Sequence, residues 1–164
     1  MLAPGLRVVF CGSAVGAVSA KVGAPYAGPG NKFWPMLHKT GLTPRLMRPD
    51  EYLELPGFGI GLTDLAKHYS GADAGLRPED DDVDALIAKV ERFRPRLLAF
   101  NGKRAASKVL GKCDYGEQPD RLAGARVFVL PSTSGLAVRF WDEAPWFALA
   151  QAALGAAAFT GSST

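Results

Sequence analysis

The sequence has few of the residues that build metal sites or disulfide frameworks, with two cysteines and two histidines among 164 residues. Cys11 and Cys113 stand far apart, and neither belongs to a Cys-x-x-Cys pair. This use of cysteine excludes a small disulfide-stapled fold and fits a reducing cytoplasm. We therefore expect a cytoplasmic protein with no metal and no other cofactor.

Long apolar runs are also missing. The alanine-rich stretch near the C-terminus is interrupted by Gln151 and Gly155, and it is too short to cross a bilayer. The N-terminus lacks the charged and apolar regions of a signal peptide. With 48% hydrophobic residues, the chain predicts one soluble domain over residues 1–164, in which residues 161–164 form a disordered tail.

The charge distribution points weakly to an anionic partner. The formal net charge is +3, although Glu79, Asp80, Asp81, Asp82 and Asp84 gather five acids in one short run. The rest of the chain is therefore more basic than its total suggests. A basic surface of this kind favours nucleic acid as a partner.

The hydrophobic pattern alternates between strands and helices. We expect strands at Leu6–Cys11, Phe58–Leu62, Arg96–Phe100 and Arg126–Leu130, and helices at Asn31–Thr40, Pro49–Leu55, Pro78–Phe93, Lys103–Leu110 and Pro145–Phe159. Such alternation predicts an α/β fold of three layers, α/β/α, with a central four-stranded parallel sheet.

One edge of that sheet is the expected binding edge, because ligands of parallel sheets bind beyond the carboxyl ends of the strands. A glycine turn at Gly12–Gly16 follows the first strand and begins a long loop that reaches Gly30. Glycine lets the backbone approach a ligand closely, although an ordinary strand-to-loop connection remains the alternative. Thr63-Asp64, Asn101-Gly102 and Pro131–Gly135 should converge on the same edge.

Four ordered motifs resemble the mismatch-specific uracil-DNA glycosylase and thymine-DNA glycosylase family of the uracil-DNA glycosylase superfamily. The turn Gly12-Ser13-Ala14-Val15-Gly16 is similar to the family's Gly-Ile-Asn-Pro-Gly, and residues 19–34 resemble its Ser-Ala…Gly-x-Pro-Phe-Ala-x-Pro-x-Asn-Arg-Phe-Trp segment. Residues 61–65 and 129–136 resemble Gly-Val-Thr-x-Leu and Val-Leu-Pro-Asn-Pro-Ser-Gly-Leu. The resemblance covers residues 6–159.

This resemblance implies a base-flipping DNA repair enzyme. Such enzymes extrude the nucleotide into a pocket before the sugar–base bond breaks. Backbone groups of Gly12, Ala14, Val15 and Gly16 would then hold the pyrimidine. Tyr26 would stack on the base, unless it is only a core tyrosine.

The chain departs from the family at the residues that carry chemistry. Ala14 replaces the asparagine that positions the attacking water, and a methyl group can neither donate nor accept a hydrogen bond. Ser132 replaces a second asparagine, and Thr133 replaces a proline. The catalytic assignment of the family therefore does not transfer directly.

Asp64 is our candidate for the missing catalytic function, because a carboxylate can orient or deprotonate water and stabilise a positively charged sugar. Two alternatives remain: Asp64 caps the next segment, or it reads the pyrimidine edge. Ser13 is a second catalytic candidate that would help to hold water, or else it satisfies local backbone. The Asn101 amide could pair with a pyrimidine, or Asn101 serves only as a turn residue before Gly102.

The last motif would form the loop that enters the duplex. Leu136 would fill the gap left by the flipped nucleotide, with Ser134 and Gly135 beside it and Ser132 near the base. Lys21, Lys103 and Arg139 are candidate phosphate contacts.

The leading hypothesis is a monomeric, monofunctional glycosylase that removes uracil, expected to be mispaired with G, and other damaged pyrimidines from double-stranded DNA. The first alternative is a non-catalytic binder of damaged or mismatched DNA, which Ala14 favours. The second is a nucleotide-binding protein, but the turn lacks Gly-x-Gly-x-x-Gly and does not open directly into a helix.

Overall fold

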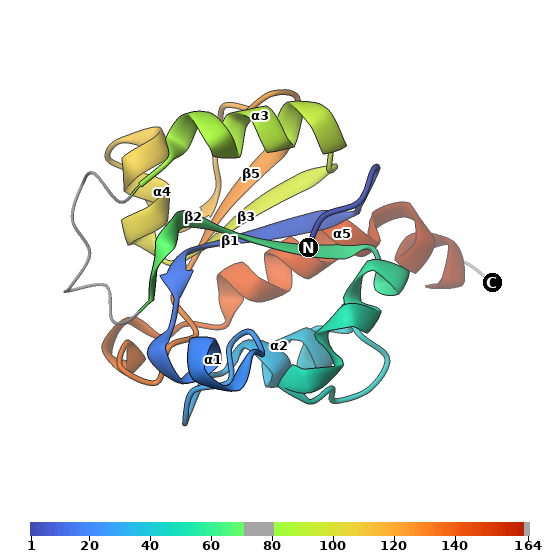
Figure 1. The fold of residues 1–164 in the computed structure, drawn as a ribbon. Coiled ribbons are helices and arrows are strands. Elements are labelled where there is room, and N and C mark those ends of the chain that lie inside the picture. Colours follow the sequence, from blue (N-terminus) through green and yellow to red (C-terminus); the bar gives the residue numbers. More distant parts are fainter. Residues whose placement is uncertain (71–80, 163–164) are drawn as a thin grey trace.

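The computed structural model describes residues 1–70 and 81–162, and it has helices on both faces of a five-stranded sheet (Figure 1). The strand order is β2-β1-β3-β5-β4. The four parallel strands are β1 (Val8–Val15), β2 (Ile60–Ser70), β3 (Leu97–Asn101) and β5 (Arg126–Leu130). This confirms the predicted α/β fold. The fifth strand, β4 (Gly116–Glu117), was not predicted because two residues carry no periodic signal, and it pairs antiparallel to β5.

The pleat of β1 assigns its residues to two cores. Val8 and Phe10 pack on the face covered by α2 (Phe33–Lys39) and α5 (Ala144–Ser162). Val9 and Cys11 pack on the opposite face with residues of α3 (Val83–Phe93) and α4 (Lys103–Leu110). Figure 1 shows these two helical layers on either side of the sheet. Side chains two residues apart on one strand therefore share a face.

The predicted glycine turn at Gly12–Gly16 is wrong, because β1 continues through Val15. Its register with β2 runs Gly12↔Asp64 and Ala14↔Ala66, with an irregularity between Ala14 and Val15. Gly and Ser disfavour strands when judged alone, but pairing with a neighbouring strand overrides that preference. The predicted loop to Gly30 likewise contains a short helix, α1 (Ala17–Val22), which follows Gly16.

β2 is also longer than its prediction. Phe58–Leu62 was expected, with Asp64 just beyond the strand, whereas β2 extends to Ser70 and holds Asp64 in its interior. The polar pair Thr63-Asp64 looked like the end of a strand, but each residue pairs with a β1 residue. Asp64 therefore lies within a strand and not at the start of a helix, the usual place of a capping residue.

Several helix boundaries differ from those predicted. The helix expected at Pro49–Leu55 is a 3-10 helix, η1, that runs from Pro49 to Phe58. α3 begins at Val83, where the Asp82 carboxylate accepts a hydrogen bond from the Ala85 N–H, and the expected start at Pro78 lies outside the described residues. A second 3-10 helix, η4 (Val138–Phe140), follows β5.

The C-terminal helix runs further than expected. α5 begins one residue before Pro145 and extends to Ser162 across a kink at Gly155. Residues 161 and 162, predicted as part of a disordered tail, therefore belong to α5, and residues 163–164 lie outside the described part. Within residues 1–70 and 81–162, no helix combines the length and apolarity needed to cross a bilayer.

Candidate functional site at the carboxyl edge of the sheet

Three neighbouring strands place Asp64, Gly12 and Asn101 in one row across the sheet. Gly12 of β1 is in register with Asp64 of β2, and Cys11 is in register with Phe100, the residue before Asn101 on β3. All three positions point to the sheet face that α2 and α5 cover, because the residue two positions earlier on each strand packs on that face. These earlier residues are Phe10, Leu62 and Ala99. The row lies at the carboxyl edge of the sheet, where sequence reasoning expected these residues to converge.

Gly12 has no side chain, and its place in the row is filled by neighbours. A Cβ atom at position 12 would lie 2.9 Å from Oδ1 of Asp64 and 3.3 Å from the hydroxyl oxygen of Tyr26. Both oxygens therefore approach the same point above β1. A methyl group at this position would therefore force the Asp64 carboxylate to shift.

Tyr26 reaches this point from the segment between α1 and α2. Its ring is stacked on Phe33 of α2, with centroids 4.0 Å apart and planes 23° apart. Phe33 is itself buried against Phe10 and Trp34. One face of the Tyr26 ring is thus occupied by the core, so a planar ligand can stack only on the other face. The two roles expected of Tyr26, in the core and in stacking on a base, are therefore compatible.

The Tyr26 hydroxyl sits in a desolvated and negatively charged environment. Burial raises the pKa of this phenol far above its ordinary value, and the nearby Asp64 carboxylate raises that pKa further. The Asn101 amide interacts with the hydroxyl and acts in the opposite direction, lowering the pKa. Tyr26 remains a neutral phenol, able to donate a hydrogen bond to an anion or to water held near Asp64.

Asn101 is held by Thr133 of the loop that follows β5. The Asn101 Nδ2 group donates to the Thr133 hydroxyl oxygen at 2.9 Å, and the Thr133 N–H donates to Asn101 Oδ1 at 3.0 Å. Both residues are buried. Thr133 was not singled out from the sequence as a site residue, although its replacement of the family's proline was a visible signal.

Ser13, the second catalytic candidate, does not join Asp64. It is buried and follows Cys11 by two residues, so the pleat of β1 points it to the α3 and α4 face. Asp64 lies with Gly12 on the opposite face. The structure separates the two predicted catalytic residues because neighbouring residues of a strand point in opposite directions.

The remaining residues of the first motif lie around the end of β1. Ala14 shares the face of Gly12 by the same alternation and is half-buried, while Val15 and Gly16 are exposed. The ladder between β1 and β3 ends at Cys11↔Phe100, so the segment from Gly12 to Val15 extends past its neighbour on that side. Within this segment Gly12 and Ser13 are buried, and its end at Val15 is exposed.

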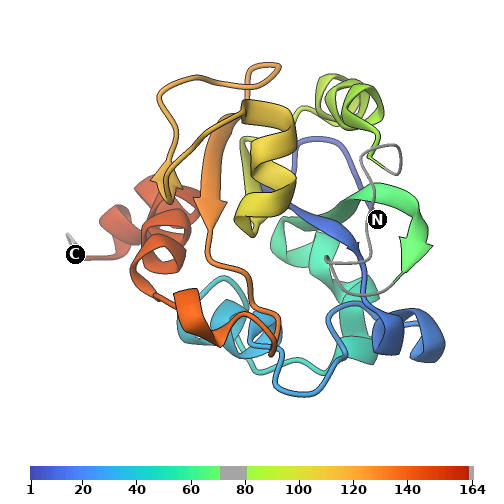
Figure 2. The same ribbon diagram turned by 90° about the vertical axis from the view of Figure 1, so that its left-hand side faces the viewer.

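Figure 2 looks onto this edge, where α1 and the segment containing η4 both lie below the strand ends, α1 to the right and η4 to the left. Leu136 in the latter segment is 85% exposed. Its N–H donates to the Ser134 hydroxyl oxygen, and the Ser134 N–H donates to that of Ser132. Gly135 packs so tightly that a Cβ there would lie 2.6 Å from the Pro29 carbonyl oxygen.

The three predicted phosphate contacts have different surroundings. Lys21 lies exposed in the last turn of α1, and Arg139 lies exposed in η4, both in elements at the carboxyl edge. Lys103 begins α4 directly after Gly102, which follows the end of β3 at Asn101, and its ammonium stands 4.3 Å from the centroid of the Tyr115 ring. That cation–π contact competes with any phosphate contact.

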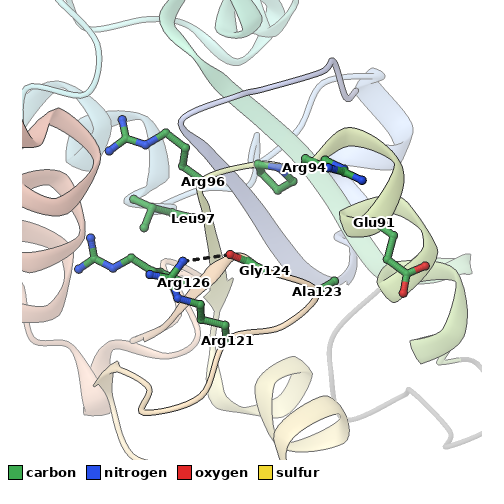
Figure 3. Close-up of a pocket in the computed structure, with 9 residues that line it drawn as sticks. Glu91, Arg94, Arg96, Leu97, Arg121, Ala123, Gly124 and Arg126 are labelled. Atoms are coloured by element: carbon green, nitrogen blue, oxygen red, sulfur yellow. Dashed lines mark hydrogen bonds between the residues drawn. The ribbon is translucent and has the colours of Figure 1, made fainter.

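A basic region lies at the opposite, amino edge of the sheet, around a pocket of about 630 Å³ (Figure 3). Arg94, Arg96, Arg121 and Arg126 contribute to its lining. Figure 3 shows the guanidinium groups of Arg96 and Arg126 on one side and that of Arg94 on the other. These charges do not converge on a common point, unlike the polar groups around Gly12.

Among the residues that the structure describes, no three His, Cys, Asp or Glu side chains come close enough together to hold a metal ion.

Comparison with known protein families places these observations in a wider context. Residues 1–154 match the family model described as the uracil DNA glycosylase superfamily. The match includes the row at the carboxyl edge and the loop around Leu136. It confirms the superfamily that the four sequence motifs indicated.

Proposed function

The chain belongs to the uracil DNA glycosylase superfamily, whose members are DNA glycosylases, hydrolases of base excision repair. From this premise, we propose that it is a monofunctional glycosylase of the mismatch-specific and thymine-DNA glycosylase type. Its substrate is uracil, mispaired with G in double-stranded DNA, together with other damaged pyrimidines. The observation that most directly supports this proposal is that the Asp64 carboxylate and the Tyr26 hydroxyl approach one point above Gly12.

Asp64 activates the water in this proposal. The water oxygen attacks C1′ of the deoxyribose, the bond from C1′ to the pyrimidine nitrogen breaks, and the bonding electron pair leaves with the base. The Asp64 carboxylate accepts a proton from the water and stabilises the positive charge on the sugar. It supplies what Ala14 cannot, and Ala14 follows Gly12 on the same face of β1.

The flipped pyrimidine binds beside β1, where the strand extends past β3. Peptide N–H groups there are suited to the negative charge that develops on the departing base, since fixed donors need no reorganisation during the reaction. The free face of Tyr26 stacks on the base, and its hydroxyl supplies a hydrogen bond near Asp64. The Phe33 ring behind Tyr26 fixes the stacking platform.

Leu136 enters the duplex and fills the space of the flipped nucleotide. An exposed apolar side chain at the binding edge is costly to keep in water, and a base stack offers it an apolar environment. Lys21 and Arg139 contact phosphates on either side. Because an apolar wedge acts only on stacked DNA, Leu136→Ala should slow cleavage of a duplex substrate more than of a single strand.

The direct test is release of the base. A labelled duplex with a single U opposite G is incubated with the protein and then treated with alkali, which cleaves the strand at any abasic site. Strand cleavage that requires U supports the proposal, and lack of cleavage at stoichiometric protein contradicts it. The same duplex with T or C in place of U defines the substrate range.

A second function is favoured by one observation, the alanine at position 14. A scaffold without a side chain that positions water could recognise a flipped base and leave it attached. A gel-shift measurement on the same U·G duplex distinguishes the two functions. Tight binding without cleavage would identify a non-catalytic binder of damaged or mismatched DNA.

A further inference from the structure

Thr133 is a polar residue with only 1% of its surface exposed, in a loop at the edge of the sheet. Its hydroxyl and its N–H both bond to the Asn101 side chain, 32 residues away in the sequence. The described residues contain no buried side-chain nitrogen or oxygen without a partner. Loss of either bond would therefore leave a buried polar group unsatisfied, which is costly.

The amide of Asn101 has little capacity left for a substrate. An amide offers two N–H donors and one oxygen with two acceptor positions. Thr133 takes one donor and one acceptor position, and the Tyr26 hydroxyl also interacts with this side chain. The bond to Asn101 Oδ1 also depends on the Thr133 N–H, which a proline lacks.

Thr133 is tied to a second part of the site through its carbonyl oxygen, which accepts a hydrogen bond from the Lys32 N–H at 2.9 Å. Lys32 directly precedes Phe33, the residue on which Tyr26 stacks. Gly135 packs on Pro29 and Gly30 of the same segment. One residue thus connects the end of β3 and the support of Tyr26 to the loop that carries Leu136.

We propose that Thr133 and Asn101 form a positioning clasp, defined as the two hydrogen bonds between them. The clasp sets the place of loop 131–137 relative to Asp64 and Tyr26, so that insertion of Leu136 and capture of the base occur together. Asn101 is then a positioning residue and does not read the base. The inference about DNA rests on the proposed glycosylase function, whereas the inference about the loop does not.

Two substitutions at position 133 separate the clasp from general stability. Thr133→Val keeps the shape and the N–H but removes the hydroxyl, so Asn101 Nδ2 loses an acceptor. Thr133→Ser keeps both bonds and serves as the matched control. We expect Thr133→Val to lower kcat/KM on the U·G duplex about tenfold, mainly through KM, and on single-stranded DNA by no more than about twofold. Thr133→Ser should stay within about twofold on both substrates.

If Thr133→Val lowered kcat/KM by the same factor on the duplex and on the single strand, the coupling between insertion of Leu136 and capture of the base would be overturned. The same would follow if Thr133→Val and Thr133→Ser lowered kcat/KM by the same factor. A change confined to kcat would place the residue in chemistry instead of positioning.

Hydrogen exchange tests the clasp without reference to activity. In the protein without DNA, amide exchange across residues 131–140 should be at least about fivefold faster in Thr133→Val than in Thr133→Ser, with exchange in β1 and β3 unchanged. Equal exchange in both variants would disprove the clasp even if the wild-type enzyme cleaves DNA. Faster exchange in a protein that never cleaves would support the clasp and reject the glycosylase.

Discussion

The two edges of the sheet are both rich in functional groups, yet they differ in how these groups are arranged. At the amino edge, four arginines line one pocket, but their guanidinium groups do not meet at one point, and Arg126 forms an ion pair with Glu117. At the carboxyl edge, one carboxylate and one phenol approach the same point above a glycine, and one amide interacts with the phenol. The pKa of Tyr26 is strongly raised there, whereas Arg94 and Arg96 remain exposed.

Convergence and desolvation of polar groups therefore identify a reactive site better than density of charge does. Exposed arginines are screened by water and interact weakly with one another. A partly buried oxygen beside another polar group changes its chemistry, because water no longer solvates it fully. Perturbed groups of this kind cluster at functional sites.

The strongest test of this contrast exchanges one carboxylate at each edge for its amide. Asp64→Asn should slow uracil release by about a hundredfold or more, because an amide cannot accept the proton from water. Glu91→Gln in the arginine pocket, the matched control, should leave the rate unchanged. Single-turnover cleavage of the U·G duplex measures both. A near-normal rate for Asp64→Asn would remove Asp64 from the chemistry.

A smaller loss of activity is expected when a methyl group is added at the crowded position of Gly12. Gly12→Ala places a methyl group 2.9 Å from Asp64 Oδ1, so the carboxylate must move, and we expect kcat/KM to fall by about ten- to a hundredfold. Gly16→Ala is the control, since a Cβ there meets nothing within 4 Å and Gly16 has an extended backbone with a φ of −65°. Similar losses in the two variants would show that space above β1 is not what Gly12 provides.

The Tyr26 hydroxyl predicts a pH dependence of stability. Its folded-state pKa lies above the ordinary value of 10.0, so the unfolded chain releases this proton first as the pH rises. Stability from this group is therefore present below about pH 10 and falls above it, by up to about 1.4 kcal/mol per pH unit. Urea denaturation from pH 8 to 11 should show a shallower alkaline decline for Tyr26→Phe than for the wild type. Parallel curves would mean that the hydroxyl ionises normally.

The smallest effect is expected at the amino edge. Arg94→Ala and Arg96→Ala remove exposed charges that have no common target, so activity on the U·G duplex should change by less than about twofold. Cleavage measured at two salt concentrations checks this, with Lys21→Ala as the comparison at the carboxyl edge. A loss at Arg94 or Arg96 equal to that at Lys21 would mean that DNA also contacts the amino edge.

Much of the fold was predictable because local pattern and tertiary environment agree. The boundaries of α4 and β5 match their predictions, and the strong periodicity of α3 placed its last residue at Phe93. β1 and β2 were drawn too short, because Gly12, Ser13 and Asp64 resemble chain breakers when read singly. Only pairing between the two strands makes that segment extended.

The candidate site was predicted in part. The motifs indicated Gly12, Tyr26 and Asp64, the strand pattern brought Asn101 to the same carboxyl edge, and the fold places all four together. The motifs could not separate Ser13 from Asp64, since that depends on a pleat whose phase is set by strand pairing. Nor could they find the bonds between Thr133 and Asn101, which join residues 32 positions apart.

The sequence by itself determined the layered α/β class and the superfamily, because both depend on periodicity and on short motifs that local residues carry in full. Which side chains meet was decided by the tertiary structure alone. Strand register aligns Gly12 with Asp64, and the close packing of Tyr26 on Phe33 sends its hydroxyl to the same point. Contacts of this kind arise only when distant segments are buried together, since burial fixes the face and the depth of every group.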